Sequence, residues 1–503
     1  MNALPSLLPT FELGAEFAQR HHALSVPYTL SGNSLLEHQA AIESNARSYP
    51  RHIPLALQRA QGIYVEDIEG RVFIDCLAGA GTLALGHNHP VVIEAIQQVL
   101  RDGAPLHTLD LTTPVKDRFI RDLFDLLPTE LARHGRVQFC GPTGADAVEA
   151  ALKLTKTATG RSLVLAFHGA YHGMTQGALN LMGNLGPKRP LHGGLQDVQF
   201  LPYPYDFRCP FGLGGQAGTE AGLNYIRTVL TDPESGVPRA AAMILETIQG
   251  EGGVIPAPDD WMRGIRAATT ASDIPLIVDE VQTGFGRTGR MFAFEHAGIV
   301  PDVVTLSKAI GGSLPLSVVV YREELDQWSP GAHAGTFRGH QLAMAAGSAT
   351  LRFLRAEALH QQAAGLGHTL LGLLRELQAD YPQIGDVRGR GLMIGAEIVD
   401  PAGSPDRLGH RPANGALASV LRDECLRRGL ILELGGRSGS VVRFLPPLII
   451  TAQQIRHVFE IFAAALRAAV QSCGSDSATS RSHDRFPSGS VDPQDESSGH
   501  HVR

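Results

Sequence analysis

Short apolar runs alternate with helical stretches between about Val91 and Leu354. The runs read RVQFC, SLVLAF, AAMILET, PLIVDE, DVVTLSK and LSVVVY. Several are apolar at nearly every position, as in strands that are buried on both faces, and intervening helices allow such strands to run parallel. The pattern predicts a mostly parallel sheet covered by helices, with a ligand site beyond the carboxyl ends of its strands.

The N-terminal part of the chain has a different pattern. Residues 1–33 are mixed in polarity and predict a loosely held arm, with a short helix around 13–22. Residues 34–90 begin with a helical stretch around 36–46. They continue in GIYVEDIEGRVFIDC, where two alternating segments joined at 69–70 predict a β-hairpin. This segment is expected to form the N-terminal part of a small domain.

The remaining boundaries follow from changes in composition. Residues 91–354 form the predicted large domain, and residues 355–470 combine Leu/Ala/Arg-rich helices with the strand candidates DVRGRGLMIGAEI, LILELGG and VVRFLPPLII. This segment predicts the other part of a smaller α+β domain, which would therefore be built from both chain ends. Residues 471–503 are rich in Ser, Asp, Gly and His and predict a disordered tail.

Charge and cysteine content exclude several classes of protein. The chain has 43 basic and 50 acidic residues, a net charge of −7, and no basic stripe for nucleic acid. It has no signal-peptide pattern and no apolar run of membrane-spanning length, so we expect a cytoplasmic protein without a membrane partner. Its five widely spaced cysteines contain no CxxC pair, which favours buried free thiols.

Lys308 follows the apolar segment DVVTLS and precedes a pair of glycines. Partial desolvation at such a strand end lowers the pKa of an amine and makes it available for Schiff-base chemistry. The alternative is a solvated surface lysine.

Asp279 ends the apolar run PLIVD, 29 residues before Lys308. A buried carboxylate needs a cationic partner, and the protonated pyridine nitrogen of pyridoxal 5'-phosphate (PLP) is one. The alternative for Asp279 is the acidic start of a loop or helix.

A third feature is CGPTGADAVEAALKLTKTATG, in which a glycine-containing turn opens a strongly helical stretch. The free amides of Gly144 and Ala145, together with the helix dipole, form an anion site suited to a phosphate. The alternative is an ordinary helix capped by Thr143.

Together these motifs resemble the class III aminotransferases, which are PLP enzymes of fold type I. The resemblance covers about 33–466 and implies a large mostly parallel-sheet domain plus a smaller α+β domain, with PLP as the cofactor. It implies that Lys308 is the Schiff-base lysine and that Asp279 pairs with the pyridine nitrogen. The other cofactor contacts that it implies are Gly144 and Ala145 for the phosphate, Tyr171 stacked on the ring and Gln282 on its phenolic oxygen.

The same resemblance implies roles beyond the cofactor. Thr336 in GTFRGH matches a threonine that reaches the phosphate of the neighbouring subunit, which implies an obligate homodimer. Arg388 in DVRGRG matches an arginine for the substrate α-carboxylate. Glu251 in QGEGG matches a glutamate that pairs with that arginine while an ω-amine donor is bound. For Arg388 and Glu251 the alternative is a surface ion pair.

Within the family the chain looks most like the enzymes that transaminate L-2,4-diaminobutyrate with 2-oxoglutarate for siderophore or related biosynthesis. Met174 and His340 depart from the ornithine-specific pattern, in which an arginine and an asparagine stand at these positions. Three alternatives stay open: another ω-aminotransferase (4-aminobutyrate, ornithine or an ectoine-pathway donor), a PLP aminomutase or decarboxylase, and a non-catalytic scaffold. His87 and His89 have no further ligand at metal spacing, so we expect no metal there.

Overall fold

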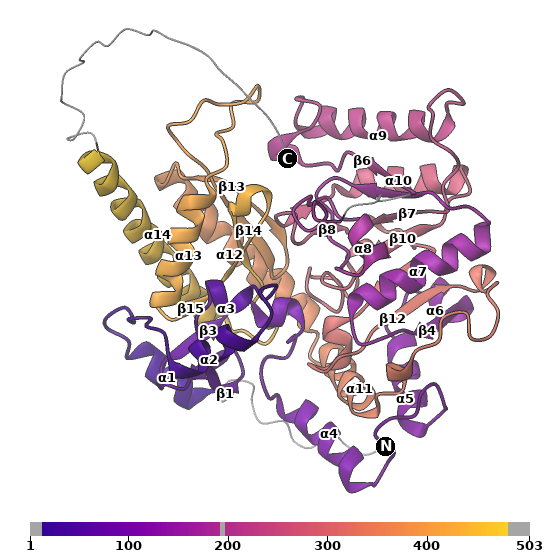
Figure 1. The fold of residues 1–503 in the computed structure, drawn as a ribbon, viewed down its shortest axis with the longest axis horizontal. Coiled ribbons are helices and arrows are strands. Elements are labelled where there is room, and N and C mark those ends of the chain that lie inside the picture. The colour runs from indigo at the N-terminus through magenta and orange to yellow at the C-terminus, as the bar shows by residue number, and fades with distance from the viewer. Residues whose placement is uncertain (1–12, 192–196, 481–503) are drawn as a thin grey trace, which may run out of the picture.

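The computed structural model describes residues 13–191 and 197–480 (Figure 1). Its central element is a seven-stranded sheet in the order β4-β12-β11-β10-β7-β5-β6. Strand β12 is antiparallel to both of its neighbours, while β11, β10, β7, β5 and β6 pair in parallel. The predicted mostly parallel sheet is confirmed. The bounds are β4 (Gly135–Phe139), β5 (Val164–Phe167), β6 (Val198–Leu201), β7 (Ala242–Leu245), β10 (Leu276–Asp279), β11 (Val303–Leu306) and β12 (Val318–Arg322).

Both faces of this sheet are buried, because neighbouring residues of each strand point to opposite sides. Ile244 and Ile277 pack with the helix α7 (Gly144–Thr159) on one face. On the other face Met243 and Val278 belong to a larger core that includes Trp261 of helix α10 (Asp259–Ala271). The near-continuous apolar runs of the sequence therefore reflect burial on two sides.

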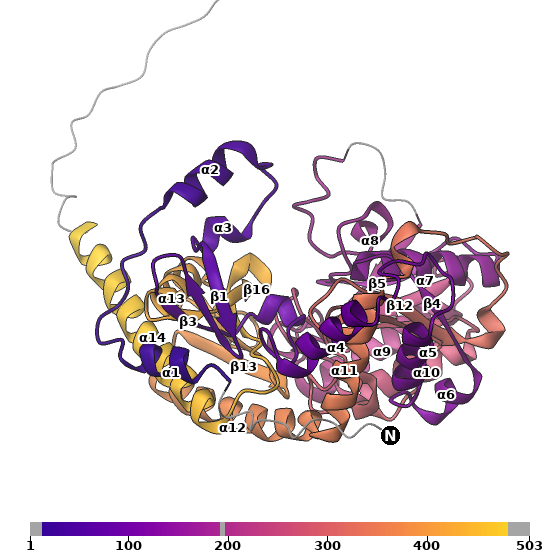
Figure 2. The same ribbon diagram turned by 90° about the horizontal axis from the view of Figure 1, so that it is seen from below.

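Two smaller sheets join segments from the chain ends (Figures 1 and 2). The predicted hairpin is confirmed by the antiparallel pair β2–β3, and β3 also pairs with β15, more than 350 residues later. The first sheet comprises β1 (Leu57–Gln61), β2 (Tyr64–Asp67), β3 (Val72–Asp75) and β15 (Leu430–Ile431). The second comprises β13 (Ile384–Arg390), β14 (Met393–Ile398), β17 (Val441–Phe444) and β16 (Glu433–Gly435), and a two-stranded pair joins β8 (Ile248–Gln249) and β9 (Ile255–Pro256).

Helices surround the three sheets. The longer ones begin and end as follows: α2 (Ser34–Ile42), α4 (Pro90–Arg101), α5 (Pro114–Phe124), α9 (Gly215–Thr231), α11 (Gln341–Ala356), α12 (Leu359–Asp380) and α13 (Gly415–Arg427). The short ones are α3 (Tyr49–His52), α6 (Thr129–His134) and α8 (Gln176–Asn180). No helix in the described part of the chain is both long enough and apolar enough to cross a bilayer.

The two terminal segments differ from their predictions. Helix α1 (Ala15–His22) is not loosely held, because Phe17 and His21 are buried against the small sheet and the C-terminal helix. Helix α14 (Ala452–Ser480) continues ten residues past the predicted end of order at 470. Apolar residues of its earlier turns, such as Phe462 and Leu466, are fully buried and support the helix that continues from them. Residues 1–12 and 481–503 lie outside the described residues, and the boundaries at 33, 90 and 354 stay predictions.

Candidate active site

Three loops meet at the carboxyl edge of the seven-stranded sheet. Asp279 ends β10 and lies beside Thr305 of the parallel strand β11, and Lys308 follows two residues after the end of β11. The first residue of α7, Gly144, lies so close to the loop after β10 that a Cβ atom there would be 2.8 Å from Val281 Cγ1. Parallel strands place their carboxyl ends at one edge, so residues 29 positions apart become neighbours.

Lys308 has the properties expected of a reactive amine. Its Nζ has no hydrogen-bond or ion-pair partner among the described residues, and its backbone is in the left-handed region with φ +52°. Burial lowers the pKa of Lys308 to about 8, although the nearby carboxylate of Glu251 acts in the opposite direction. The amine is therefore neutral in a much larger fraction of molecules at neutral pH than the amine of an exposed lysine.

Asp279 is a buried carboxylate held from two sides. Its Oδ2 lies 2.7 Å from His172 Nδ1, and its Oδ1 accepts hydrogen bonds from Thr305 Oγ1 at 3.0 Å and from the Val281 amide at 3.1 Å. Burial opposes the charge of His172, but the hydrogen bond and the charge of Asp279 outweigh it and raise the His172 pKa. His172 Nε2 is buried without a partner. The arrangement fixes both oxygens of a buried carboxylate at the place where a cationic partner could meet it.

Tyr171 follows β5 and lines a cleft of about 980 Å³, together with Met174, Glu251 and Arg437. Its backbone amide donates to Glu246 Oε1 at 2.9 Å. Burial raises the pKa of Glu246 to about 7, with a further contribution from the charge of Asp279. The carboxyl group of Glu246 thus fixes the turn that carries Tyr171 and His172.

Gln282 and Thr336 lie in very different surroundings. Gln282 Nε2 donates to the Ala80 carbonyl at 2.9 Å, and its side chain packs so closely on Gly250 that any Cβ there would overlap it. Thr336 is exposed at the start of a short helical turn, and its neighbour Phe337 is 62% exposed. The assigned roles of Gln282 and Thr336 stay predictions.

The structure pairs Glu251 with Arg443 and not with the predicted Arg388. Glu251 Oε1 lies 2.8 Å from Nη1 of Arg443, which is in strand β17 and has a side chain that is 1% exposed. The two groups attract by charge, but no hydrogen bond joins them, and none of the three nitrogens of Arg443 has a hydrogen-bond partner among the described residues. Both side chains contribute to the electrostatic environment of Lys308. Arg443 is therefore a buried guanidinium with unused donors beside the reactive amine.

Arg388, the predicted receptor of the substrate carboxylate, is engaged by other partners, and that role stays a prediction. Its Nη1 pairs with Asp386 at 2.7 Å and with Glu397 at 2.8 Å. Its Nε and Nη2 both donate to the carbonyl oxygen of Gly253. Nε also donates to the Val254 carbonyl, and Nη2 to the Tyr205 hydroxyl. A substrate carboxylate would have to displace these partners. Arg388 fastens β13 to the loop after Glu251.

Sequence reasoning missed His172, Glu246 and Arg443. Arg443 was inside VVRFLPPLII, which was interpreted only as a strand, although a single arginine in so apolar a run is itself a signal of a buried cation with a function. His172 and Glu246 had no signal apart from their positions next to Tyr171 and at the end of β7.

Comparisons with known proteins agree with this geometry. A family model described as "Aminotransferase class-III" matches residues 45–466. The chain is 59% identical over 430 residues to a diaminobutyrate--2-oxoglutarate aminotransferase of Rhizobium meliloti (strain 1021), covering 86% of this chain and 92% of the relative. It is 54% identical to an enzyme of the same name from Haemophilus influenzae, covering 82% and 91%.

A solved structure is also similar. The ornithine aminotransferase from Toxoplasma gondii, whose structure shows partial occupancy of PLP at the active site, has a TM-score of 0.73 and 25% identity. The match covers 87% of this chain and 95% of that one.

Proposed function

We propose, from the premise that this chain belongs to the class III aminotransferases, that it transfers the C4 amine of L-2,4-diaminobutyrate to 2-oxoglutarate. The products are L-aspartate 4-semialdehyde and L-glutamate. The similar enzymes of R. meliloti and H. influenzae are named diaminobutyrate--2-oxoglutarate aminotransferase. The reaction proceeds in two halves, and one site accepts both amines in turn.

The cofactor of the family is PLP, and the residues of the site fit it. Lys308 offers a half-buried amine without a hydrogen-bond or ion-pair partner among the described residues, and Asp279 offers a buried carboxylate fixed by His172 and Thr305. The N-terminus of α7 at Gly144 lies at the same sheet edge, where its free amides suit a phosphate. When bound, PLP supplies an aldehyde for the amine and a protonated ring that withdraws electrons.

The protein's own residues would then do three things. Lys308 Nζ would hold the cofactor and afterwards move a proton between the carbon atoms that exchange the amine. Asp279 would keep the ring nitrogen protonated, since a charged carboxylate favours the cationic form of its partner. Tyr171, presented by the turn that Glu246 fixes, would cover the ring.

The observation that carries the substrate proposal is the Glu251–Arg443 ion pair beside Lys308. Glutamate must place its α-amine at the reacting atom and its α-carboxylate on a cation, for which Arg443 has unused donors. Diaminobutyrate must instead present its C4 amine. Glu251 would neutralise Arg443 in the half-reaction with diaminobutyrate. It would release Arg443 in the half-reaction with glutamate. An enzyme that handles both an ω-amine and an α-amine requires such an exchange.

The test is a panel of amino donors with 2-oxoglutarate, namely diaminobutyrate, ornithine and 4-aminobutyrate, with identification of both products. We expect diaminobutyrate to have the highest kcat/KM and to lose only its C4 amine. A higher kcat/KM for ornithine or 4-aminobutyrate would reassign the donor, and release of carbon dioxide would reassign the reaction class.

A cytoplasmic homodimer with shared active sites is part of the proposal. Thr336 is exposed, and so are the apolar side chains of Leu106, Leu111 and Phe337 near it in the fold, which supports coverage by a second subunit. Supply of diaminobutyrate for siderophore or related synthesis is also proposed. A strain that lacks the enzyme should then need diaminobutyrate to make that product.

A further inference from the structure

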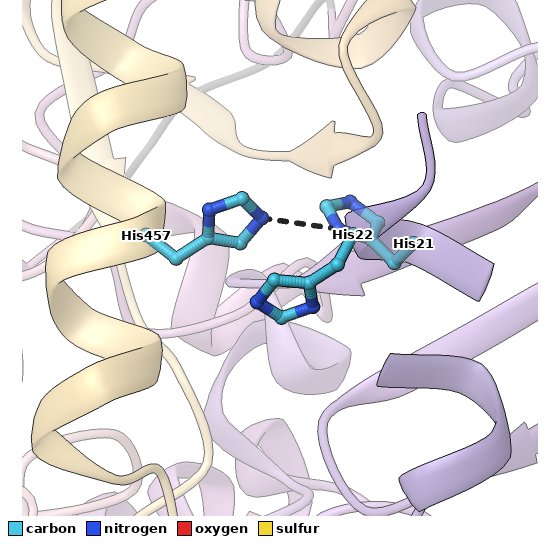
Figure 3. A group of neighbouring side chains, drawn as sticks. All are labelled: His21, His22 and His457. Carbon is cyan, nitrogen blue, oxygen red and sulfur yellow. Dashed lines mark hydrogen bonds between the residues drawn. The ribbon is translucent and has the colours of Figure 1, made fainter. Parts of the chain in front are cut away.

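Three histidines from opposite ends of the sequence meet between helices α1 and α14 (Figure 3). His21 and His22 end α1, and His457 lies in the second turn of α14. His21 is buried, His457 is half-buried and His22 is exposed. None of the three belongs to the candidate active site, so the mechanism above does not account for their arrangement.

One nitrogen of each ring faces an oxygen atom outside the cluster. His21 Nε2 lies 3.0 Å from the Gly429 carbonyl, and His22 Nδ1 lies 2.7 Å from the Ala18 carbonyl. His457 Nδ1 lies 3.6 Å from Glu460 Oε2. A carbonyl oxygen at hydrogen-bond distance holds the proton on the outer nitrogen of His21 and of His22 and leaves the lone pair on the inner one. The negative charge of Glu460 favours the same tautomer in His457. Metal-bound histidines are oriented by the same kind of partner.

The inner nitrogens then face one another. His21 Nδ1 and His457 Nε2 are 3.2 Å apart. With both outer nitrogens protonated, two lone pairs would point at each other across this gap, which is unfavourable unless a proton or a metal ion lies between them. A proton would join only these two rings. A metal ion would also engage His22, whose ligand atom lies within 4.8 Å of the other two.

The distances suit a tetrahedral metal ion. Nitrogen ligands at about 2.1 Å from a tetrahedral ion are roughly 3.4 Å apart, close to the 3.2 Å between His21 Nδ1 and His457 Nε2. The His22 ring is stacked on His457 with centroids 4.5 Å apart, so it must tilt to direct its lone pair at the same point. The exposed ring can tilt about its contact with the Ala18 carbonyl, and its exposure leaves the fourth coordination position open to water.

We propose that His21, His22 and His457 bind a divalent transition-metal ion, with Zn²⁺ as the best match. The cluster supplies only neutral imidazoles as ligands, which suit Zn²⁺, Ni²⁺ or Cu²⁺ and not the oxygen-seeking Mg²⁺ or Ca²⁺. The ion fastens the N-terminal helix α1 to the last helix α14, segments that lie side by side in the fold. Sequence spacing could not reveal the site, because two of its ligands are 436 residues apart.

The experiment uses the full-length holoenzyme, first treated with a chelator and then dialysed against Zn²⁺. Bound zinc per chain is measured for the wild type, His22→Gln, His457→Gln and the matched control His38→Gln, an exposed histidine of α2. The wild type and His38→Gln should each bind one more zinc ion per chain than His22→Gln and His457→Gln. Co²⁺ in place of Zn²⁺ should give the visible absorption of a four-coordinate ion only in those two proteins, and excess Mg²⁺ should not displace it.

A second measurement separates binding from folding. In chelator all four proteins should unfold at the same temperature, and added Zn²⁺ should raise the midpoint only in the wild type and His38→Gln. If His457→Gln is unstable in chelator, the exposed His22→Gln decides. Equal zinc content in the wild type and His22→Gln would overturn the proposal and leave the cluster as a proton-linked pair with His22 stacked on it.

Discussion

Replacement of Glu251 by glutamine tests how one site accepts two different amines. The change keeps the size of the side chain and removes the charge that faces Arg443 Nη1 at 2.8 Å. Freed Arg443 can then bind the α-carboxylate of either substrate. We expect the half-reaction with diaminobutyrate to slow, because this donor can now bind with its α-amine at the reacting atom. The half-reaction with glutamate should change little.

The size of the effect follows from the geometry. Two unit charges at 2.8 Å attract by about 6 kcal/mol at an effective dielectric constant of about 20. Arg443 is 1% exposed but Glu251 is 37% exposed, so solvent screening removes much of this value. A net contribution of about 1–3 kcal/mol corresponds to a change of roughly 5- to 150-fold in the ratio of the two half-reaction rates.

The assay is single-turnover stopped-flow spectroscopy of the cofactor's visible absorbance, with diaminobutyrate and glutamate in separate experiments and with product analysis. Asp386→Asn is the matched control, because Asp386 is similarly exposed and pairs with Arg388. Equal slowing of both half-reactions by Glu251→Gln, with amine lost only from C4, would refute the exchange. If only Asp386→Asn changes the ratio of the two half-reaction rates, Arg388 and not Arg443 binds the substrate carboxylate.

Four further predictions follow from the site. Lys308→Ala should fold but retain less than about 1% of the activity, and higher retention would identify a different reactive lysine. Asp279→Asn should keep the cofactor bound and lose several orders of magnitude in rate, since a neutral amide no longer favours a protonated ring. A rate near that of the wild type would contradict the pairing of Asp279 with the ring nitrogen. The rate at which the apoenzyme captures PLP should rise with pH and level off above about pH 8. The reason is that burial lowers the Lys308 pKa to about 8 and only the unprotonated amine reacts. A rate that continues to rise up to pH 10 would mean that the amine is not desolvated. Lys308→Ala subunits mixed with impaired Thr336→Ala subunits should regain activity in heterodimers, whereas verified heterodimers without recovery would place Thr336 in its own subunit's site.

The sequence by itself determined the architecture of the large sheet and the centre of the site. Apolar runs such as PLIVDE and DVVTLS are buried on both faces, so their composition predicts the strands of a covered, mostly parallel sheet. The similar run LSVVVY forms β12, which is antiparallel to both of its neighbours. The carboxyl ends of such strands meet at one edge, and this brings Asp279, Lys308 and the start of α7 together without any tertiary information. Composition predicts a tail without order from residue 471, whereas the helix that begins at Ala452 ends at Ser480.

Only the tertiary structure decided which charges pair. Glu251, Arg388 and Arg443 occur in three separate motifs, and no spacing in the sequence gives the distances between them. The antiparallel pairing of β17 with β14 and β16 places Arg443 toward Glu251, while Asp386 and Glu397 engage Arg388 within its own sheet. Pairing of long charged side chains depends on strand register and on competing partners a few ångströms away. The histidine cluster shows the same limit, since its three rings become neighbours only when α1 packs on α14.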